Sequence, residues 1–349
     1  MPRASARVAG ALLSLALLGA ASPSPSASGN ADAAAVAMLR ASVGAPRNVS
    51  YVGQLETIRF SSSRANAAIV RIEHRAPDLT RRWYLAPESA YGDYIVSRGD
   101  TSYEFDTKHA QVTVTRNLAL DNAVASDANL TRILANYRPV AGGNEIVAGH
   151  QTTALTLMNK YTGEPAVKVW LDTTTHLVLK KEEYHGDGSV ASKMRFDELR
   201  YTQDIPGDVF STAAPAGYTQ VAGRDLASSD SDVQRALKEA GFKPANPHDL
   251  PQGFALTSGA VTTVSGVKTL QLVYSDGLRS ISLFQNDRAA AADFGNLRPR
   301  VVRFENHDAQ YVEDGPTTLL TWKERGLAFA LVGDLSLDEL VQIARSVVA

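Results

Sequence analysis

Hydrophobic and polar residues alternate along most of the chain between Val49 and Tyr201, and this period of two predicts β-strands. The clearest case is Ala166–Tyr184, AVKVWLDTTTHLVLKKEEY, in which one strand face carries Val167, Val169 and Leu171. Thr173–His176 then turns the chain before the apolar alternation resumes. The segment therefore predicts a β-hairpin, and His185–Gly188 predicts the next tight turn.

The same reading predicts a strand-rich first domain over residues 32–212. Two helices, Ala33–Ala41 and Ser126–Asn136, are expected to accompany its strands. So many antiparallel strands in one sheet must curl or close, because strongly twisted open sheets rarely grow larger. We expect a mainly β (α+β) fold with a large curved antiparallel sheet or half-barrel covered by helices. The predicted strands are Val49–Phe60, Ala67–His74, Arg81–Leu85, Tyr91–Ser97, Thr101–Asp106, Gln111–Arg116, Asn144–Val147, Thr152–Asn159, Ala166–Leu171, Leu177–Tyr184 and Val190–Tyr201.

The composition changes at residues 213–231, an Ala/Ser/Asp/Gly-rich stretch that predicts a linker. A smaller α+β domain is expected over residues 232–349, beginning with a helix at Ser231–Ala240. Its last helix, Ser336–Val347, starts with a capping box formed by Ser336 and Glu339. Between them lie one more predicted helix, Arg288–Phe294, and strands at Ala255–Val264, Val267–Tyr274, Ser280–Gln285, Arg300–Phe304, Ala309–Glu313, Thr317–Glu324 and Leu327–Val332.

The N-terminus has the pattern of a secretory signal peptide, with Arg3 and Arg7 before the apolar run Val8–Ala21. We expect residues 1–21 to be removed and residues 22–31 to be a flexible leader. The alternative, an uncleaved membrane anchor, needs about 20 apolar residues, and this run is shorter. The chain contains no cysteine, which excludes both disulfides and a lipid anchor on cysteine.

The charged and catalytic residue types point away from several functions. The formal net charge is −2 without a basic stripe, which argues against a nucleic-acid partner. None of the seven histidines lies four residues from another, and the pairs Glu182–Glu183 and Asp197–Glu198 point to opposite strand faces. We therefore expect no catalytic residue, metal site or cofactor, and interpret most of the histidines as exposed or as turn residues.

A set of large apolar strand residues has two interpretations. They form an ordinary core, or they line a hydrophobic cavity of the kind that a curved sheet with few covering helices can enclose. If they line a cavity, they are candidate ligand-binding residues, and the sequence does not decide between core and cavity. The set is Trp83, Tyr94, Leu155, Leu157, Trp170, Met194 and Phe196.

Several of these segments together resemble the MucB/RseB family of periplasmic regulators. The resemblance rests on the Trp-Leu-Asp hairpin, on Ile146–His150 before it and on Phe196–Arg200 beyond it. In the second domain it continues through Leu250–Phe254, Tyr274–Leu278, Ser280–Phe284, Val332–Leu335 and Ile343–Ser346. The hairpin alone is only moderately specific, because LolA-, LolB- and LppX-like carriers have similar curved sheets, whereas the second-domain segments are similar to MucB/RseB.

The resemblance implies a LolA-like first domain and a MucB/RseB-like second domain in a periplasmic envelope-stress sensor without catalysis. Such a protein binds the extracytoplasmic segment of an anti-sigma factor, protects it from proteolysis and releases it when a lipid or lipopolysaccharide-like amphiphile binds. It is peripheral to the membrane at most, and self-association as a homo-oligomer stays open. Candidate partner-binding residues are Tyr274, Asp276, Leu278 and Phe284. The alternative function is a periplasmic lipid or lipoprotein carrier.

Overall fold

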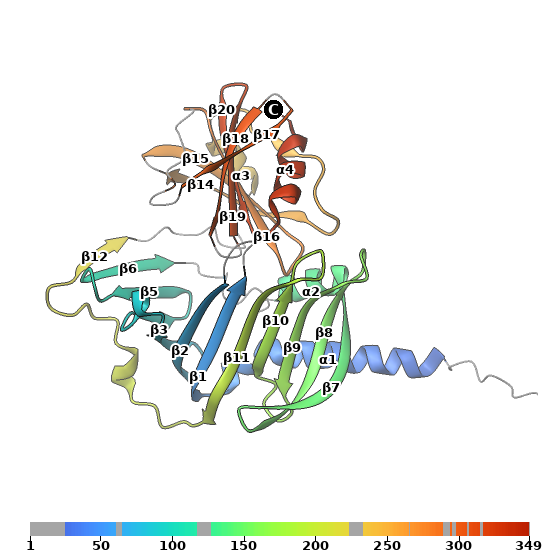
Figure 1. Ribbon diagram of the computed structural model, residues 1–349, viewed down its shortest axis with the longest axis vertical. Helices are drawn as coiled ribbons and strands as arrows, with labels where there is room; N and C mark the ends of the chain where they lie inside the picture. The colour runs from blue at the N-terminus through green and yellow to red at the C-terminus, as the bar shows by residue number, and fades with distance from the viewer. Residues whose placement is uncertain are drawn as a thin grey trace, which may run out of the picture.

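The chain forms two domains, each built on its own β-sheet (Figure 1). The structure is a computed structural model that describes residues 25–60, 65–116, 127–222, 233–264, 266–288, 294, 298–305, 307–314 and 317–348. The large domain has a 12-stranded sheet in the order β12-β6-β5-β4-β3-β2-β1-β11-β10-β9-β8-β7, and the small domain has a seven-stranded sheet. The expectation of a mainly β fold with a large sheet, few helices and a smaller second domain is confirmed.

The large sheet is open: the meander β1 to β6 and the meander β7 to β11 join through the pairing of β1 with β11, while β7 and β12 remain as edges. All neighbouring pairs are antiparallel except β12 with β6. Its strands are β1 (Tyr51–Phe60), β2 (Ala65–Arg75), β3 (Leu79–Ala86), β4 (Tyr94–Arg98), β5 (Thr101–Asp106), β6 (Gln111–Arg116), β7 (Tyr137–Val147), β8 (His150–Asn159), β9 (Pro165–Asp172), β10 (Val178–Tyr184), β11 (Val190–Tyr201) and β12 (Thr219–Ala222).

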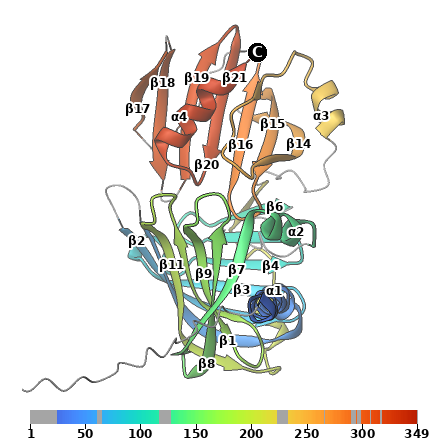
Figure 2. The ribbon, with the colours of Figure 1, turned by 90° about the vertical axis from the view of Figure 1, so that its right-hand side faces the viewer.

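Two α-helices pack on this sheet, α1 (Pro25–Asn48) and α2 (Asp127–Asn136). Figure 2 looks along α1, which lies against β7 and β8 beside the curved sheet. Two short 3-10 helices, η1 (Glu88–Ala90) and η2 (Gly207–Phe210), complete the domain. The predicted bounds of α1 were wrong: it begins within the expected flexible leader and continues past Gly44 and Pro46. Its last turns are held by tertiary contacts and not by helix propensity, since Ala45 is buried and the Pro46 carbonyl bonds to His74.

The hairpin predicted from Ala166–Tyr184 is confirmed as β9 and β10, with Val167 opposite Glu183 and Val169 opposite Lys181. The turn at His185–Gly188 is also confirmed, since the His185 amide donates to the Ser189 carbonyl at 2.8 Å. Asp172 holds the first turn, because its Oδ1 accepts the amides of Thr174 and Thr175, both at 2.8 Å. The local pattern therefore fixed this part of the fold.

Two strand predictions of the large domain were wrong. β7 begins at Tyr137 rather than at Asn144, because tertiary pairing with β8 overrides Pro139 and the two glycines that suggested a break. β12 lies inside the segment expected to be a linker. It was missed because its four residues pair in parallel with β6, a long-range contact that leaves little local pattern.

The small domain packs helix α4 (Leu337–Ser346) on its sheet, against β19, while α3 (Val233–Glu239) packs on β14 and β15. The predicted capping box is confirmed at the start of α4. The predicted helix Arg288–Phe294 falls mostly outside the described residues. The strands are β13 (Asn246–Pro247), β14 (Ala255–Val264), β15 (Val267–Ser275), β16 (Ser280–Asn286), β17 (Arg300–Phe304), β18 (His307–Asp314), β19 (Thr317–Glu324), β20 (Leu327–Gly333) and β21 (Val347–Val348).

The cores of the two domains differ in organisation. The buried apolar residues of the small domain form one cluster, centred on residues such as Leu272, Leu283 and Leu331. Those of the large domain form three separate clusters. One of the three joins α1 and α2 to the sheet through Leu39, Ile133 and other residues. Large open sheets cannot gather all their apolar residues at one centre, so they build several local cores.

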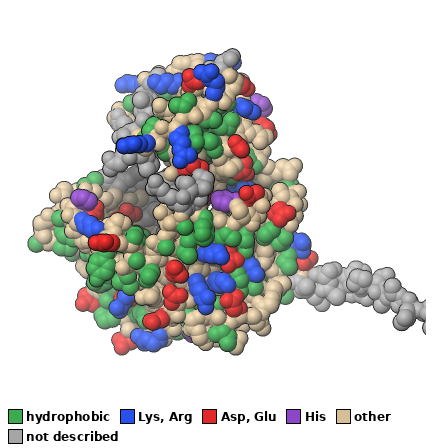
Figure 3. Space-filling view, viewed as in Figure 1, with side chains coloured by type: hydrophobic (Ala, Val, Ile, Leu, Met, Phe, Trp, Pro, Cys, Tyr) green, Lys and Arg blue, Asp and Glu red, His purple; other side chains and the backbone are tan. Residues whose placement is uncertain are grey.

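The surface carries both signs of charge. Figure 3 shows Lys/Arg and Asp/Glu side chains interspersed over the viewed face. Within the part of the chain that the structure describes, no helix is both long and apolar enough to cross a membrane.

Candidate functional site

The candidate site lies where the turn between β15 and β16 meets the large domain. Asp276 organises this turn, because its Oδ1 accepts the backbone amides of Leu278 at 2.9 Å and Arg279 at 2.7 Å. The Arg279 Nε lies 3.4 Å from Asp276 Oδ2. Asp276 is only 1% exposed, so its carboxylate depends on these partners in place of water. The turn is therefore a rigid projection of the small domain.

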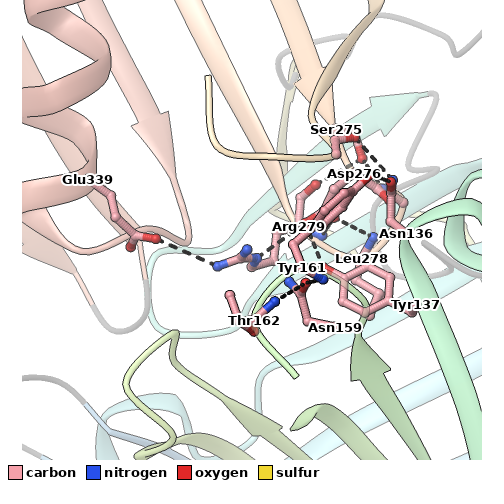
Figure 4. Close-up of polar contacts among 12 residues, drawn as sticks. Asn136, Tyr137, Asn159, Tyr161, Thr162, Ser275, Asp276, Leu278, Arg279 and Glu339 are labelled. Carbon is pink, nitrogen blue, oxygen red and sulfur yellow. Dashed lines mark hydrogen bonds and ion pairs between the residues drawn. The ribbon is translucent and has the colours of Figure 1, made fainter. Parts of the chain in front are cut away.

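The large domain contacts this projection through the junction of α2 and β7 (Figure 4). The Tyr137 hydroxyl donates to Asp276 Oδ2 at 2.6 Å. The Asn136 side-chain amide donates to the backbone carbonyls of Asp276 at 2.8 Å and of Gly253 at 3.1 Å. Tyr161 fixes the amide by donating to its oxygen at 3.0 Å. Buried hydrogen bonds thus join the domains, and each lost partner leaves a buried polar group unsatisfied.

Close backbone approach adds a steric requirement at Gly277. This glycine has φ +104°, and a Cβ placed on it would lie 2.8 Å from the Ile133 backbone nitrogen in α2. Asn129 also donates from its side chain to the Gly277 carbonyl at 3.1 Å. Only glycine satisfies both the backbone conformation and the short distance to α2. Leu278, beside it, packs against the core cluster that contains Ile133.

The charged and titratable groups at this contact shift one another's pKa values. Burial raises the pKa of Tyr137, and the nearby Asp276 carboxylate raises it further, so the tyrosine stays protonated and remains a donor. Burial acts to lower the pKa of Arg279, but Asp276, Tyr137 and Glu339 outweigh it and the net shift is upward. The contact is thus an ion pair shielded from water and completed by a tyrosine from the other domain.

A cleft opens next to this contact, with a volume of about 930 Å³. One side belongs to the large domain and includes Tyr161, Glu164 and the tip of the β10–β11 hairpin. The opposite side belongs to the small domain and includes Arg279 and the first turn of α4. Arg279 belongs both to the cleft and to the contact between the domains, which is called the docking contact below and is formed by Asn136, Tyr137, Tyr161, Asp276 and Arg279. Within the cleft, Arg279 Nη1 lies 3.8 Å from Glu339 Oε1 (Figure 4).

The structure brings two of the four expected partner-binding residues into the docking contact. They are Asp276 and Leu278, which face the large domain of the same chain. Tyr274 instead lies in the core of the small domain, 4% exposed, with its hydroxyl 3.3 Å from Asn246 Oδ1. Phe284 is half-buried in β16. Binding of a partner by these four residues stays a prediction.

The residues expected to line a cavity do not come together in one place. Leu155 and Leu157 belong to the cluster beneath α1 and α2. Trp170 lies opposite Ala154, whereas Leu155 lies opposite Val169, so strand alternation puts Trp170 on the other face of β8 and β9 from the leucines. The other members are dispersed: Met194 and Phe196 in the Trp170 cluster, Tyr94 stacked on Phe105, and Trp83 exposed by 37%.

Asp172 and His150, both within the family-like segments of the large domain, also contact each other. The Asp172 carboxylate is 3.4 Å from His150 Nδ1, and His150 Nε2 lies 3.3 Å from the Leu199 carbonyl. Burial would raise the pKa of Asp172, but amide hydrogen bonds from Thr175 and Thr174 outweigh it and lower the pKa. This arrangement holds the ends of several strands together.

Sequence reasoning missed the residues of the large domain that receive the turn. Asn136 and Tyr137 end one predicted helix and precede a predicted strand, and they are about 140 positions from their partners. The available signal was the pair of polar residues at the C-terminal end of an amphipathic helix, since such a position needs hydrogen-bond partners. The interpretation of most histidines as exposed also failed for His74, which is 4% exposed and bonded to the Pro46 carbonyl.

No group of three or more His, Asp or Glu residues in the described ranges is arranged to hold a metal ion. The polar residues at the contact between the domains hold one another through hydrogen bonds and one ion pair. These bonds fix the two domains to each other.

Fold and site together define a class: a two-domain, mainly β protein with a large open sheet and a small α+β domain docked on it through a buried aspartate turn. A family model described as the MucB/RseB N-terminal domain matches residues 42–214, so this part of the chain is a MucB/RseB N-terminal domain. Residues 244–347 match a different model, a domain of unknown function named DUF4367. A MucB/RseB-type second domain therefore stays a prediction.

Solved structures with this fold include both domains. The chain is similar to "MucB in complex with MucA(peri)", with 18% identity, a TM-score of 0.61 and coverage of 90% of this chain and 98% of that one. It is equally similar to the Pseudomonas aeruginosa MucA/MucB complex, with 17% identity, a TM-score of 0.61 and the same coverage. A crystal structure of MucB alone gives a TM-score of 0.53 at 18% identity and the same coverage. At these identities the likeness is one of fold. The comparison with curated protein sequences gave no match.

Proposed function

We propose that the protein is a periplasmic envelope-stress regulator that binds the extracytoplasmic segment of an anti-sigma factor. The observation that carries this proposal is the MucB/RseB domain within a two-domain fold similar to that of MucB in complex with MucA(peri). The cleft between the domains supports it further, because it offers a concave surface bordered by both of them. The protein acts in this proposal by binding and has no catalytic role.

In the same proposal, binding protects the anti-sigma factor from proteolysis, and a lipid or lipopolysaccharide-like amphiphile releases it. Release requires only that the amphiphile prefer a conformation of the protein that holds the segment poorly. Coupling of about 1–3 kcal/mol between two such sites is typical and changes affinity by about 5- to 150-fold. The docking contact supports this idea, since it is a discrete set of bonds between two domains that two conformations can make or break.

The decisive experiment presents the extracytoplasmic segment of the anti-sigma factor encoded beside this protein to the secreted chain. We expect binding by titration calorimetry, slower digestion of the segment by the protease that acts on it, and loss of protection when lipopolysaccharide is added. No measurable binding at tens of micromolar would remove the proposed function. The alternative of a lipid or lipoprotein carrier predicts instead that native mass spectrometry finds bound acyl chains and that removal of the small domain leaves lipid transfer unchanged.

A further inference from the structure

The cleft between the domains is strongly asymmetric in charge. Carboxylates line it from both domains, whereas Arg279 is the one lysine or arginine among the described residues that line it. The Arg279 guanidinium is already held by Asp276 and lies near Glu339. His185 adds a single imidazole. The carboxylates that line the cleft are Glu164, Asp187, Glu313, Asp338 and Glu339.

Three of these carboxylates, Glu164, Asp187 and Asp338, form no ion pair among the described residues. Asp187 is held by hydrogen bonds that its Oδ1 accepts from the Ser189 amide at 2.9 Å and the Ser189 hydroxyl at 2.6 Å. Glu164 and Asp338, which approach the cleft from different domains, are therefore the carboxylates best placed to receive a cation. The rest of the cleft wall is suited to apolar contacts, with the rings of Phe60, Tyr161 and Tyr184 exposed to it. The wall thus combines unbalanced negative charge with aromatic surface.

Acidic residues of both domains also meet just before the start of α4. Burial raises the pKa of Asp334, and the Glu183 carboxylate of the large domain raises it further, while Arg59 opposes the shift. Glu183 is itself paired with Lys181 at 2.7 Å. Glu183 of the large domain and Asp334 of the small domain therefore lie close enough to affect each other, with Arg59 and Lys181 offsetting part of their charge.

We infer that the cleft binds a basic segment of the partner, in which arginine or lysine residues alternate with apolar side chains. This inference rests on the proposed function, because the occupant is taken to be the extracytoplasmic segment of the anti-sigma factor. The basic side chains pair with Glu164 and Asp338, and the apolar ones pack on the aromatic rings. Such charges give specificity and salt dependence more than affinity, since the cleft is open to water.

The test uses the secreted two-domain chain with Glu164→Gln and Asp338→Asn combined. Its matched control is Asp197→Asn with Asp204→Asn, which removes the same charge from exposed residues outside the cleft lining. We expect the cleft variant to bind the anti-sigma segment about three- to tenfold more weakly, with a smaller loss of affinity on adding salt. The control variant should bind like the unaltered protein, and both should keep its unfolding midpoint.

The outcomes separate this inference from the proposed function. If the segment binds the unaltered protein and the cleft variant equally well, the inference is wrong and the proposed function stands. If the segment does not bind the unaltered protein at all, the proposed function fails, and two synthetic peptides then decide the inference alone. One peptide alternates Arg with Leu, and the other has Glu in place of Arg. Preference for the Arg peptide, lost in the cleft variant, supports the inference, and equal binding of both peptides overturns it.

Discussion

Asp172 in the large domain and Asp276 in the small domain hold a turn through the same hydrogen-bonding arrangement, but the two turns have different structural roles. Each is almost completely buried, at 3% and 1% exposure, and each accepts two successive backbone amides through Oδ1 to hold a turn. Each also has a cationic or ionisable partner at 3.4 Å, His150 in one case and Arg279 in the other.

The tyrosine that completes each site marks the difference. Asp172 interacts with Tyr201 of its own domain, whereas Asp276 accepts a hydrogen bond from Tyr137 of the other domain. The first site therefore stabilises a hairpin within one sheet, and the second fixes the position of one domain on another. Neighbouring backbone amides thus build the turn in both cases. The domain that supplies the tyrosine decides whether the turn also holds distant parts of the chain together.

Replacement of the two aspartates gives the largest expected contrast. Asp276→Ala removes the acceptor of the Tyr137 hydroxyl and of the Leu278 amide and leaves the half-buried Arg279 with Glu339 alone. It should cost about 3–5 kcal/mol, most of it at the contact between the domains. Unfolding should then split into two transitions, with Trp322 reporting the small domain and Trp83 and Trp170 the large one. Asp172→Ala should destabilise only the large domain. A single unchanged transition in Asp276→Ala would contradict the docking role.

The next largest effect is expected from a substitution that separates the domains by steric overlap and removes no charge. Gly277→Ala forces a Cβ to 2.8 Å from the Ile133 nitrogen, and overpacking of this kind costs about 1–3 kcal/mol in addition to backbone strain. Gly188→Ala is the matched control, since Gly188 has φ +81° and open space around its Cβ position. Limited proteolysis should show faster cleavage between the domains in Gly277→Ala alone. Equal rates in both variants would mean that backbone strain explains the whole effect.

Removal of single hydroxyl groups sharpens the comparison further. Tyr137→Phe loses one hydrogen bond to a buried carboxylate, which should cost about 1–2 kcal/mol and loosen docking. Tyr201→Phe should cost a similar amount within the large domain and leave docking unchanged. Small-angle scattering distinguishes them, because only Tyr137→Phe should increase the radius of gyration. An increase in both variants would remove the distinction between the two sites.

Acidification should give the smallest effect, and only in the large domain. Burial lowers the pKa of His74 from its ordinary value of 6.5, and Arg82 lowers it further, while the Pro46 hydrogen bond and Asp78 oppose the shift. Just below pH 6.5 the unfolded chain therefore binds more protons than the folded one, and stability falls as the pH decreases. Urea unfolding followed by large-domain tryptophans should show this loss, and His74→Gln should reduce it. An unchanged pH dependence in the variant would assign the loss to other groups.

The sequence predicted the elements with strong local patterns and missed those that depend on distant partners. β5, β6, β11, β14, β17 and β19 have the predicted bounds, because alternation and turn residues specify both their faces and their ends. β12 and the first half of β7 were missed, since pairing with β6 and β8 stabilises segments whose own composition suggests a loop or a break.

The candidate site shows the same limit. The resemblance directed attention to Tyr274–Leu278, and Asp276 and Leu278 do lie at a contact, but their neighbour is the same chain. Nothing in the local pattern indicates that Asn136 and Tyr137 receive this turn. A periodic pattern specifies which face of an element is buried, and it does not specify which of several buried faces will meet.

The open edges of the large sheet have a mechanical consequence. The chain leaves this sheet after β12, at one edge, and returns through the small domain to dock at β7, the other edge. The small domain thus connects the two edges of the curved sheet. The polypeptide chain attaches it at the β12 edge, and hydrogen bonds attach it at the β7 edge. Any event that flattens or tightens the sheet changes the distance between its two edges. The hydrogen bonds at the Asp276 turn must then stretch or break, so they are sensitive to the curvature of all twelve strands.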